Sequence, residues 1–339
     1  MTAQKQSFLD LLPPAARTAL LAVARPLAFP SGAVLIRFGQ LATGAYVLGS
    51  GSVSVMRAMP GGELLPIASL RSGAMLGEMA LVEQGRCSAT VVAVSEVEAL
   101  FVESEVFRAL VALPGETAAL LQTAMTGGLI SRLRELERRI VDCALLLDQS
   151  CLPPPVKPVP IVASQDRAPL RLDVPAFLSR MAFLQGQGEE EMAALCSLGR
   201  LRWLERGELV DVAGDHEPAC FLVVRGALEL IRRTDAGQWR LAVVGPGHLV
   251  GLVELLGLRD DESRCSIVRA CERSILMEIA GAPFRELYGG QTSLSLKVQR
   301  LVHRNLLRAI ASSNTHLTRL VSEMSLRGIG HGFNPDFAM

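Results

Sequence analysis

Residues 29–56 read FPSGAVLIRFGQLATGAYVLGSGSVSVM, a run in which short apolar stretches alternate with single glycines. Glycine recurs at positions 32, 39, 44, 49 and 51, and valine alternates with serine over 52–55. Short strands with closely spaced turn glycines are typical of a small β-roll or barrel. Gly61-Gly62 predicts a hairpin turn, and residues 91–110 fit closing strands followed by a short helix.

Residues 76–91, LGEMALVEQGRCSATV, combine residue types that suit a sugar and a phosphate. Gly77 lets the backbone approach a ligand closely, because glycine has no Cβ. Residues 78–82 can form one helical turn, whose free N–H groups attract an anion. Glu78 can accept hydrogen bonds from sugar hydroxyls, and Arg86 can pair with a phosphate. The run therefore predicts a cassette that holds a sugar phosphate.

Both stretches resemble the cyclic nucleotide-binding domain family. Its phosphate-binding cassette reads approximately Gly-Glu-x-Ala-Leu, a short spacer, and then Arg-x-Ala-Thr/Ser-Val. The resemblance implies a β-roll of the jelly-roll type that binds a regulatory nucleotide such as cyclic AMP or cyclic GMP, and it implies no other cofactor. Carried over residue by residue, the ligand-binding set of this first copy is Gly77, Glu78, Met79, Ala80, Arg86, Cys87, Ser88 and Thr90.

The cassette departs from the family pattern at its arginine. Aligning residues 88–91 with the family's ending places Cys87 where the phosphate-binding arginine belongs, and Arg86 falls one residue early. On an extended segment, a shift of one residue turns a side chain to the opposite face. Arg86 is therefore either a surface residue that faces away from the pocket, or a ligand residue if the loop is one residue tighter. Loss of a charged partner costs ~2–5 kcal/mol, which would leave weak binding.

The second half of the chain repeats the first. Residues 201–231 follow the same order of strands and turn glycines as 27–56, and residues 245–270 occupy the position of the cassette. This repeat predicts a second, degenerate β-roll.

The second cassette departs from the family at a different point. Val268-Arg269-Ala270 matches the family's ending and puts Arg264 in register with the phosphate-binding arginine. Leu252, however, stands where the ribose-binding glutamate belongs. The candidate ligand-binding set of this copy is Gly251, Arg264, Cys265 and Ser266.

The predicted fold is mainly β with flanking α-helices: two tandem rolls, each followed by a long helix. The first domain spans 1–150 with its helix, and the second spans 170–328 with its own. Between them lies the proline-rich linker 151–169, which is extended because prolines exclude a helix. Residues 329–339 form a flexible tail.

The two long helices carry apolar stripes with spacings of three and four residues, which fit helix packing. Each stripe either covers its own roll or pairs with the other stripe, within one chain or between two chains. We expect pairing and a protein partner, or a second copy of the chain, bound through these helices. The stripes consist of Leu129, Leu133, Leu136, Ile140, Cys143 and Leu147, and of Leu306, Ile310, Ser313, Leu317, Leu320 and Met324.

Composition narrows the possible functions. The 34 basic residues balance 34 acidic ones, so no excess of positive charge indicates nucleic acid. The seven cysteines show no metal-type spacing, as in a reduced cytoplasmic protein. No apolar run has the length of a membrane span, and none of the known catalytic or metal-binding patterns is present.

Three functions are consistent with these patterns. The first is a non-catalytic regulatory protein that senses a cyclic nucleotide mainly through its first roll, with a tandem architecture similar to that of the regulatory subunit of cyclic AMP-dependent protein kinase. The second is a scaffold that has lost the ligand and serves oligomerisation or docking. The third, a transcription regulator of the Crp/Fnr type, is disfavoured because a second roll occupies the region where a helix-turn-helix would lie.

Overall fold

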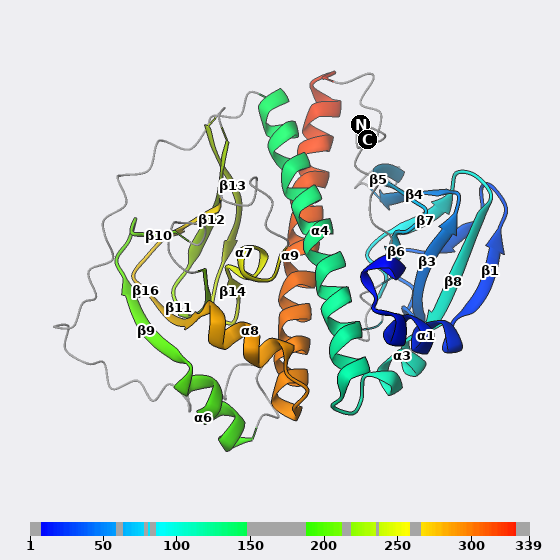
Figure 1. The fold of residues 1–339 in the computed structure, drawn as a ribbon. Coiled ribbons are helices and arrows are strands. Elements are labelled where there is room, and N and C mark those ends of the chain that lie inside the picture. Colours follow the sequence, from blue (N-terminus) through cyan, green and yellow to red (C-terminus); the bar gives the residue numbers. More distant parts are fainter. Residues whose placement is uncertain are drawn as a thin grey trace. The chain divides into compact units, whose positions relative to one another are not determined.

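The structure of the chain, a computed structural model, describes residues 8–58, 64–77, 81, 86–147, 188–211, 218–234, 237–257 and 266–329. The chain divides into two compact units. Unit 1 consists of Met1–Arg139 and Gln291–Met339, and unit 2 consists of Ile140–Gly290. Each unit contains one β-roll (Figure 1), so the prediction of two tandem rolls is confirmed.

The roll of unit 1 is a sandwich of two antiparallel four-stranded sheets, with strand orders β1-β8-β3-β6 and β2-β7-β4-β5. Apolar side chains from both sheets, such as Leu48, Val53 and Val91, meet in its interior. The strands are β1 (Arg25–Phe29), β2 (Val34–Ile36), β3 (Gly44–Ser50), β4 (Ser52–Ala58), β5 (Leu64–Arg71), β6 (Met75–Leu76), β7 (Thr90–Ala93) and β8 (Val97–Glu103). The accompanying helices are η1 (Phe8–Leu11), α1 (Pro14–Val23) and α3 (Ser104–Leu110).

Local features of the sequence explain these strands. Gly51 joins β3 to β4 at a φ of +80°, and a Cβ there would lie 2.0 Å from the carbonyl oxygen of Glu96, so only glycine fits. β4 pairs with β5 from Ser52↔Arg71 to Ala58↔Leu64, which is the pairing that the hairpin prediction requires. The predicted turn residues Gly61-Gly62 themselves lie outside the described residues.

Unit 2 repeats this architecture strand for strand. Its sheets have the orders β14-β11-β16-β9 and β10-β15-β12-β13, which are those of unit 1 with each strand number raised by eight. The strands are β9 (Gly199–Leu204), β10 (Leu209–Asp211), β11 (Ala219–Arg225), β12 (Leu228–Thr234), β13 (Gly237–Val244), β14 (Leu249–Val250), β15 (Ser266–Ala270) and β16 (Ser274–Ala280). The helices are α6 (Glu189–Ser197), α7 (Leu252–Leu256) and α8 (Gly281–Gly289).

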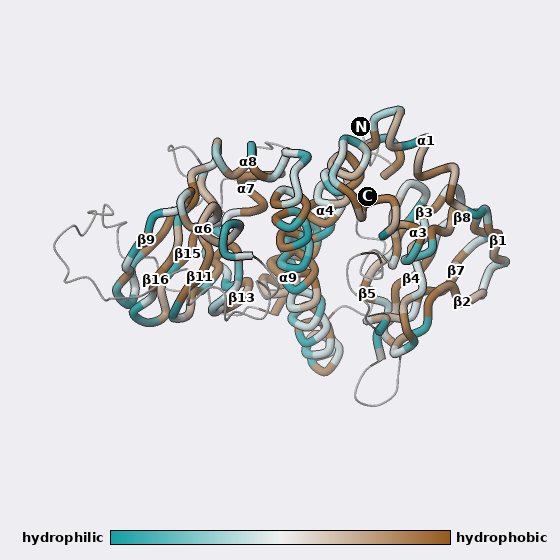
Figure 2. Tube along the Cα trace, turned by 90° about the horizontal axis from the view of Figure 1, so that it is seen from below, coloured by the Kyte–Doolittle hydropathy of each residue, from teal (hydrophilic) through white to brown (hydrophobic). Residues whose placement is uncertain are grey.

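Two long helices, α4 (Glu116–Leu146) and α9 (Ser293–Leu326), follow the two rolls along the chain. Every residue of the two predicted stripes is buried, and α9 alternates between polar and apolar residues (Figure 2). Within unit 1, Leu296 of α9 packs into the same apolar cluster as Leu121 and Met125 of α4. The structure therefore shows pairing within the chain, and pairing between chains stays a prediction.

The grouping of α9 with unit 1 makes this unit discontinuous in sequence. The sequence predicts α9 as part of the second domain, after the second roll. In the structure, unit 2 is inserted between the two helices that complete unit 1. The proline-rich segment 151–169 and residues 330–339 lie outside the described residues.

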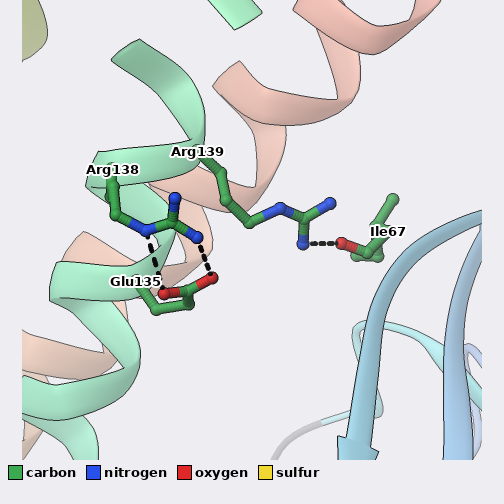
Figure 3. A network of polar contacts seen from close by, with 4 residues as sticks. All are labelled: Ile67, Glu135, Arg138 and Arg139. Carbon is green, nitrogen blue, oxygen red and sulfur yellow. Dashed lines mark hydrogen bonds and ion pairs between the residues drawn. The ribbon is translucent and has the colours of Figure 1, made fainter. Parts of the chain in front are cut away.

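Helix α4 is also tied to the first roll near its C-terminal end. The guanidinium of Arg139 donates a hydrogen bond to the carbonyl oxygen of Ile67 in β5, while Arg138 forms an ion pair with Glu135 on the helix surface (Figure 3). On α9, Thr315 accepts a 3.3 Å hydrogen bond from Arg57 of β4. Over the described ranges, none of the helices combines the length and hydropathy that crossing a membrane would require.

Candidate ligand site in the first roll

The predicted cassette begins at Gly77, directly after β6. Gly77 has a φ of +74°, and a Cβ there would lie 2.8 Å from the carbonyl oxygen of Gly44. The close approach that requires glycine is therefore to the backbone of β3. Of the predicted turn at 78–82, only Leu81 is described; it is helical and 3% exposed. The predicted ligand residues Glu78, Met79 and Ala80 lie outside the described residues.

The second part of the cassette, residues 86–90, is fixed against the turn at 38–41. The N–H of Cys87 donates to the carbonyl of Gln40 at 2.8 Å, and the carbonyl of Cys87 accepts from Gly39 at 2.9 Å. The hydroxyl of Thr90 accepts a 3.1 Å hydrogen bond from the N–H of Phe38. Thr90 therefore bonds to this turn, and Ser88 is half-buried beside it.

Arg86 and Cys87 lie in different environments. Arg86 is exposed, and its guanidinium donates a 2.7 Å hydrogen bond to the carbonyl oxygen of Gly39. Cys87 is half-buried. Tyr46 packs against the interior cluster of the roll. Arg86 is therefore the exposed residue of the two and Cys87 the half-buried one, and which of them meets a ligand stays a prediction.

The half-buried position 87 is electrically neutral. Burial raises the pKa of the Cys87 thiol, although a backbone hydrogen bond partly opposes the shift. Burial also raises the pKa of Tyr46, and the neighbouring Cys87 adds to this effect. Both groups are therefore uncharged at neutral pH. They can donate hydrogen bonds to a ligand, but they cannot neutralise a phosphate as an arginine does.

Two aromatic rings pack near Tyr46. The ring of Tyr46 lies 4.9 Å from that of Phe101 and 5.9 Å from that of Phe29. A cation on the same sheet, Arg25, has its guanidinium 5.6 Å from the centre of the Phe101 ring and forms an ion pair with Glu103. The sequence did not single out Tyr46 or Arg25, because a strand pattern does not show which side chains meet across a sheet.

The corresponding region of unit 2 is built differently. Gly251, at a φ of +87°, precedes the five-residue helix α7. Leu252, in the place of the ribose-binding glutamate, is only 4% exposed. Arg264 and Cys265 lie outside the described residues, as does the side chain of Ser266, whose backbone pairs with Arg232.

An ion pair with a buried carboxylate lies on the outward face of the sheet β10-β15-β12-β13. Val268 and Ala270 of β15 point into the interior of the roll, so the intervening Arg269 points outward. There its Nη2 lies 2.5 Å from Oε2 of Glu229, whose side chain is 10% exposed. Arg240 approaches the same carboxylate at 3.5 Å.

The described part of the chain contains no group of three His, Cys, Asp or Glu residues arranged to hold a metal ion.

Comparison with known proteins gives the family. The profile of the cyclic nucleotide-binding domain matches residues 26–113 and 201–290, which together make up just over half of the chain. The cyclic AMP receptor protein of Thermus thermophilus is 35% identical over 83 residues, which cover 24% of this chain and 38% of that protein. A putative potassium channel protein of Rhodopseudomonas palustris is 29% identical over 126 residues, covering 36% of this chain and 29% of that protein.

The chain thus spans about a third of the length of these two curated relatives. Among solved structures, the regulatory domain of Toxoplasma gondii protein kinase A with cyclic AMP is 16% identical and covers 94% of this chain and 93% of that one, with a TM-score of 0.30. The two profile matches coincide with the two rolls. The chain therefore belongs to the cyclic nucleotide-binding domain family, and it carries two tandem copies of the domain.

Proposed function

We propose that this chain is a non-catalytic regulatory protein, in which a ligand bound to the first roll changes the position of helices α4 and α9. The ligand is a cyclic nucleotide or a related molecule. Leu81 is the observation that carries the proposal, since it belongs to the cassette and at the same time to the core beneath the helices.

Leu81 packs in one apolar cluster with Phe107 of α3, Leu121 of α4 and Leu296 of α9. Packed interiors do not deform continuously, so a displaced core residue moves its neighbours. A ligand that repositions the cassette would pull Leu81 and disturb the apolar cluster that it shares with α3, α4 and α9. This supports transmission from the cassette to the helix pair without any catalytic step.

The neutral side chain at position 87 supports weak binding of an anionic ligand. Replacing an arginine by a thiol removes a charged partner, which costs ~2–5 kcal/mol, or about one to four decades in affinity. We therefore expect dissociation constants for cyclic AMP and cyclic GMP well above those of a roll with its arginine in register.

Calorimetry and hydrogen exchange on the full chain test this function together. Cyclic AMP, cyclic GMP and cyclic dinucleotides would be titrated into the wild type, and exchange in α4 and α9 would be measured with and without saturating ligand. We expect binding heat and altered exchange in both helices. Leu81→Ala should bind the ligand but lose most of the helix response. If no nucleotide gives heat, or if binding leaves both helices unchanged, the function is wrong.

A scaffold without a ligand is the second candidate. The half-buried Cys87 and the buried Leu252 favour it, since each stands where the family pattern has a charged ligand residue. Its partner would be a protein or a second copy of the chain, and a cytoplasmic location remains part of this expectation. Light scattering together with affinity purification tests it, and a monomer without a co-purifying protein contradicts it.

A further inference from the structure

Two adjacent glycines, Gly127 and Gly128, lie in the interior of the 31-residue helix α4. Glycine is the poorest helix former after proline. Neither residue has a positive φ. A Cβ on Gly127 would meet nothing within 4 Å, and one on Gly128 would lie 4.0 Å from Phe8. Neither packing nor backbone geometry therefore requires glycine at these positions, and what the pair adds is local flexibility of the helix.

The turn just before these glycines receives a polar contact from α9. Nε2 of His303 lies 2.8 Å from the hydroxyl of Thr126 and 3.0 Å from the carbonyl oxygen of Gln122. The Thr126 hydroxyl also donates to the Gln122 carbonyl at 3.1 Å. A threonine that bonds back to the carbonyl four residues earlier tends to bend a helix. Two features that weaken α4 are thus adjacent, and His303 contacts one of them.

The contacts define the state of the histidine. A carbonyl oxygen only accepts, so the 3.0 Å contact is a hydrogen bond when Nε2 carries the proton. Thr126 then shares this proton as a second acceptor, while its own hydroxyl serves Gln122. His303 is 1% exposed, and burial favours the neutral ring. One neutral side chain from α9 therefore fixes the turn that precedes the glycines.

The two halves of α4 have different attachments. Before the glycines, Ala118, Leu121, Ala124 and Met125 belong to the apolar cluster that contains Leu81 of the cassette. After the glycines, the attachment is polar: Arg139 donates a hydrogen bond to the carbonyl oxygen of Ile67 in β5. A bend at the glycines would change the angle between these two separately attached halves of α4.

We propose that Gly127-Gly128 is a hinge in α4 and that His303 of α9 is the latch that holds it straight. The hinge deepens the proposed function, because it names the point at which α4 bends. It rests on the proposed function only for the statement that ligand binding causes the bend. The hinge itself can be measured without any ligand, so its failure is distinguishable from a failure of the sensor.

Hydrogen exchange of the ligand-free full chain, resolved to short peptides, tests the hinge. In the wild type, we expect residues 127–131 to exchange faster than the turns on either side, because this segment opens locally. The double variant Gly127→Ala with Gly128→Ala should slow hydrogen exchange in this segment by roughly tenfold or more. Each substitution of glycine by alanine stabilises the helix by an amount that changes the opening equilibrium by a factor of about five. Gly289→Ala is the matched control, because Gly289 is also helical with open space around it, and it should leave α4 unchanged.

The latch is tested by two substitutions of His303. His303→Leu removes the donor and should accelerate exchange at 122–131 by about fivefold, whereas His303→Gln keeps an N–H donor and should remain near the wild type. Uniform exchange along the wild-type helix, or double-alanine slowing spread evenly over α4, would overturn the hinge. A His303→Leu effect equal throughout unit 1, or no difference between the leucine and glutamine variants, would overturn the latch.

Discussion

Nε2 of His303 lies 3.0 Å from the backbone carbonyl oxygen of Gln122, a residue 181 positions earlier in the chain. The contact joins the helix that follows the second roll to the helix that follows the first. Because the ring is buried, it also links the stability of the helix pair to pH.

Stability should fall as the pH is lowered towards 5. Burial lowers the pKa of His303 to about 4, with the Gln122 hydrogen bond acting in the opposite direction. Since the folded pKa lies below the unfolded value of about 6.5, the unfolded chain binds more protons between these limits. The contribution is complete above pH ~6.5 and is lost progressively towards pH ~4. Between pH 7.5 and 5 we expect a loss of about 2 kcal/mol.

The measurement is chemical denaturation followed by the helical circular dichroism signal. Tryptophan fluorescence is unsuitable, because Trp203 and Trp239 both belong to unit 2. His303→Gln is the control, since it cannot titrate; its stability should fall about 2 kcal/mol less over the same interval. Parallel losses in the two proteins would show that other groups cause the pH dependence.

Moving the arginine by one residue should restore a phosphate site. Cys87→Arg places a cation at the half-buried position 87, and we expect the affinity for cyclic AMP to rise by about tenfold or more. Arg86→Gln should have little effect, because Arg86 bonds to the Gly39 carbonyl on the exposed side. Isothermal titration calorimetry measures both. Adenosine, which carries no charge, should not gain from Cys87→Arg, and the opposite ranking of the two variants would place Arg86 in the site.

Two leucines of the same helix should respond very differently to truncation. Leu296 is 4% exposed and lies in the core of unit 1, whereas Leu326 is 89% exposed. Leu296→Ala removes buried methyl groups and leaves a cavity, so it should lower the free energy of unfolding by about 2–5 kcal/mol. Leu326→Ala should change it by less than about 0.5 kcal/mol. Similar values for the two variants would show that α9 does not complete this core.

The ion pair on the outward face of unit 2 should matter more than one on the surface of α4. Glu229→Gln leaves Arg269 without its buried carboxylate, which should cost about 3 kcal/mol. Glu135→Gln breaks a pair in which Arg138 is 44% exposed, and should cost less than about 1 kcal/mol. Unfolding of the Glu229→Gln variant can be followed by the fluorescence of Trp239, which lies in β13 of the same sheet as Glu229. Equal costs would mean that water reaches Glu229 freely.

Sequence patterns predicted both rolls, because turn glycines and alternating valines depend only on local geometry. Counting residues within the cassette showed the one-residue displacement of Arg86, and whether Arg86 or Cys87 meets a ligand stays a prediction. The inclusion of α9 in unit 1 could not be predicted, since a stripe such as Leu306, Ile310 and Leu317 shows that a face is buried but not what covers it. The pairing of Glu229 with Arg269 was missed for a similar reason, since the two residues are 40 positions apart and no local pattern relates them.

The insertion of unit 2 between α4 and α9 has a consequence for the nascent chain. Helix α4 ends at Leu146 and α9 begins at Ser293, so a ribosome working at ~5–20 residues per second would need roughly 7–30 s to make the intervening segment. Throughout that interval the apolar side of α4 has no α9 to cover it. A chaperone that protects this protein during translation would therefore be needed between the completion of the first roll and the emergence of α9.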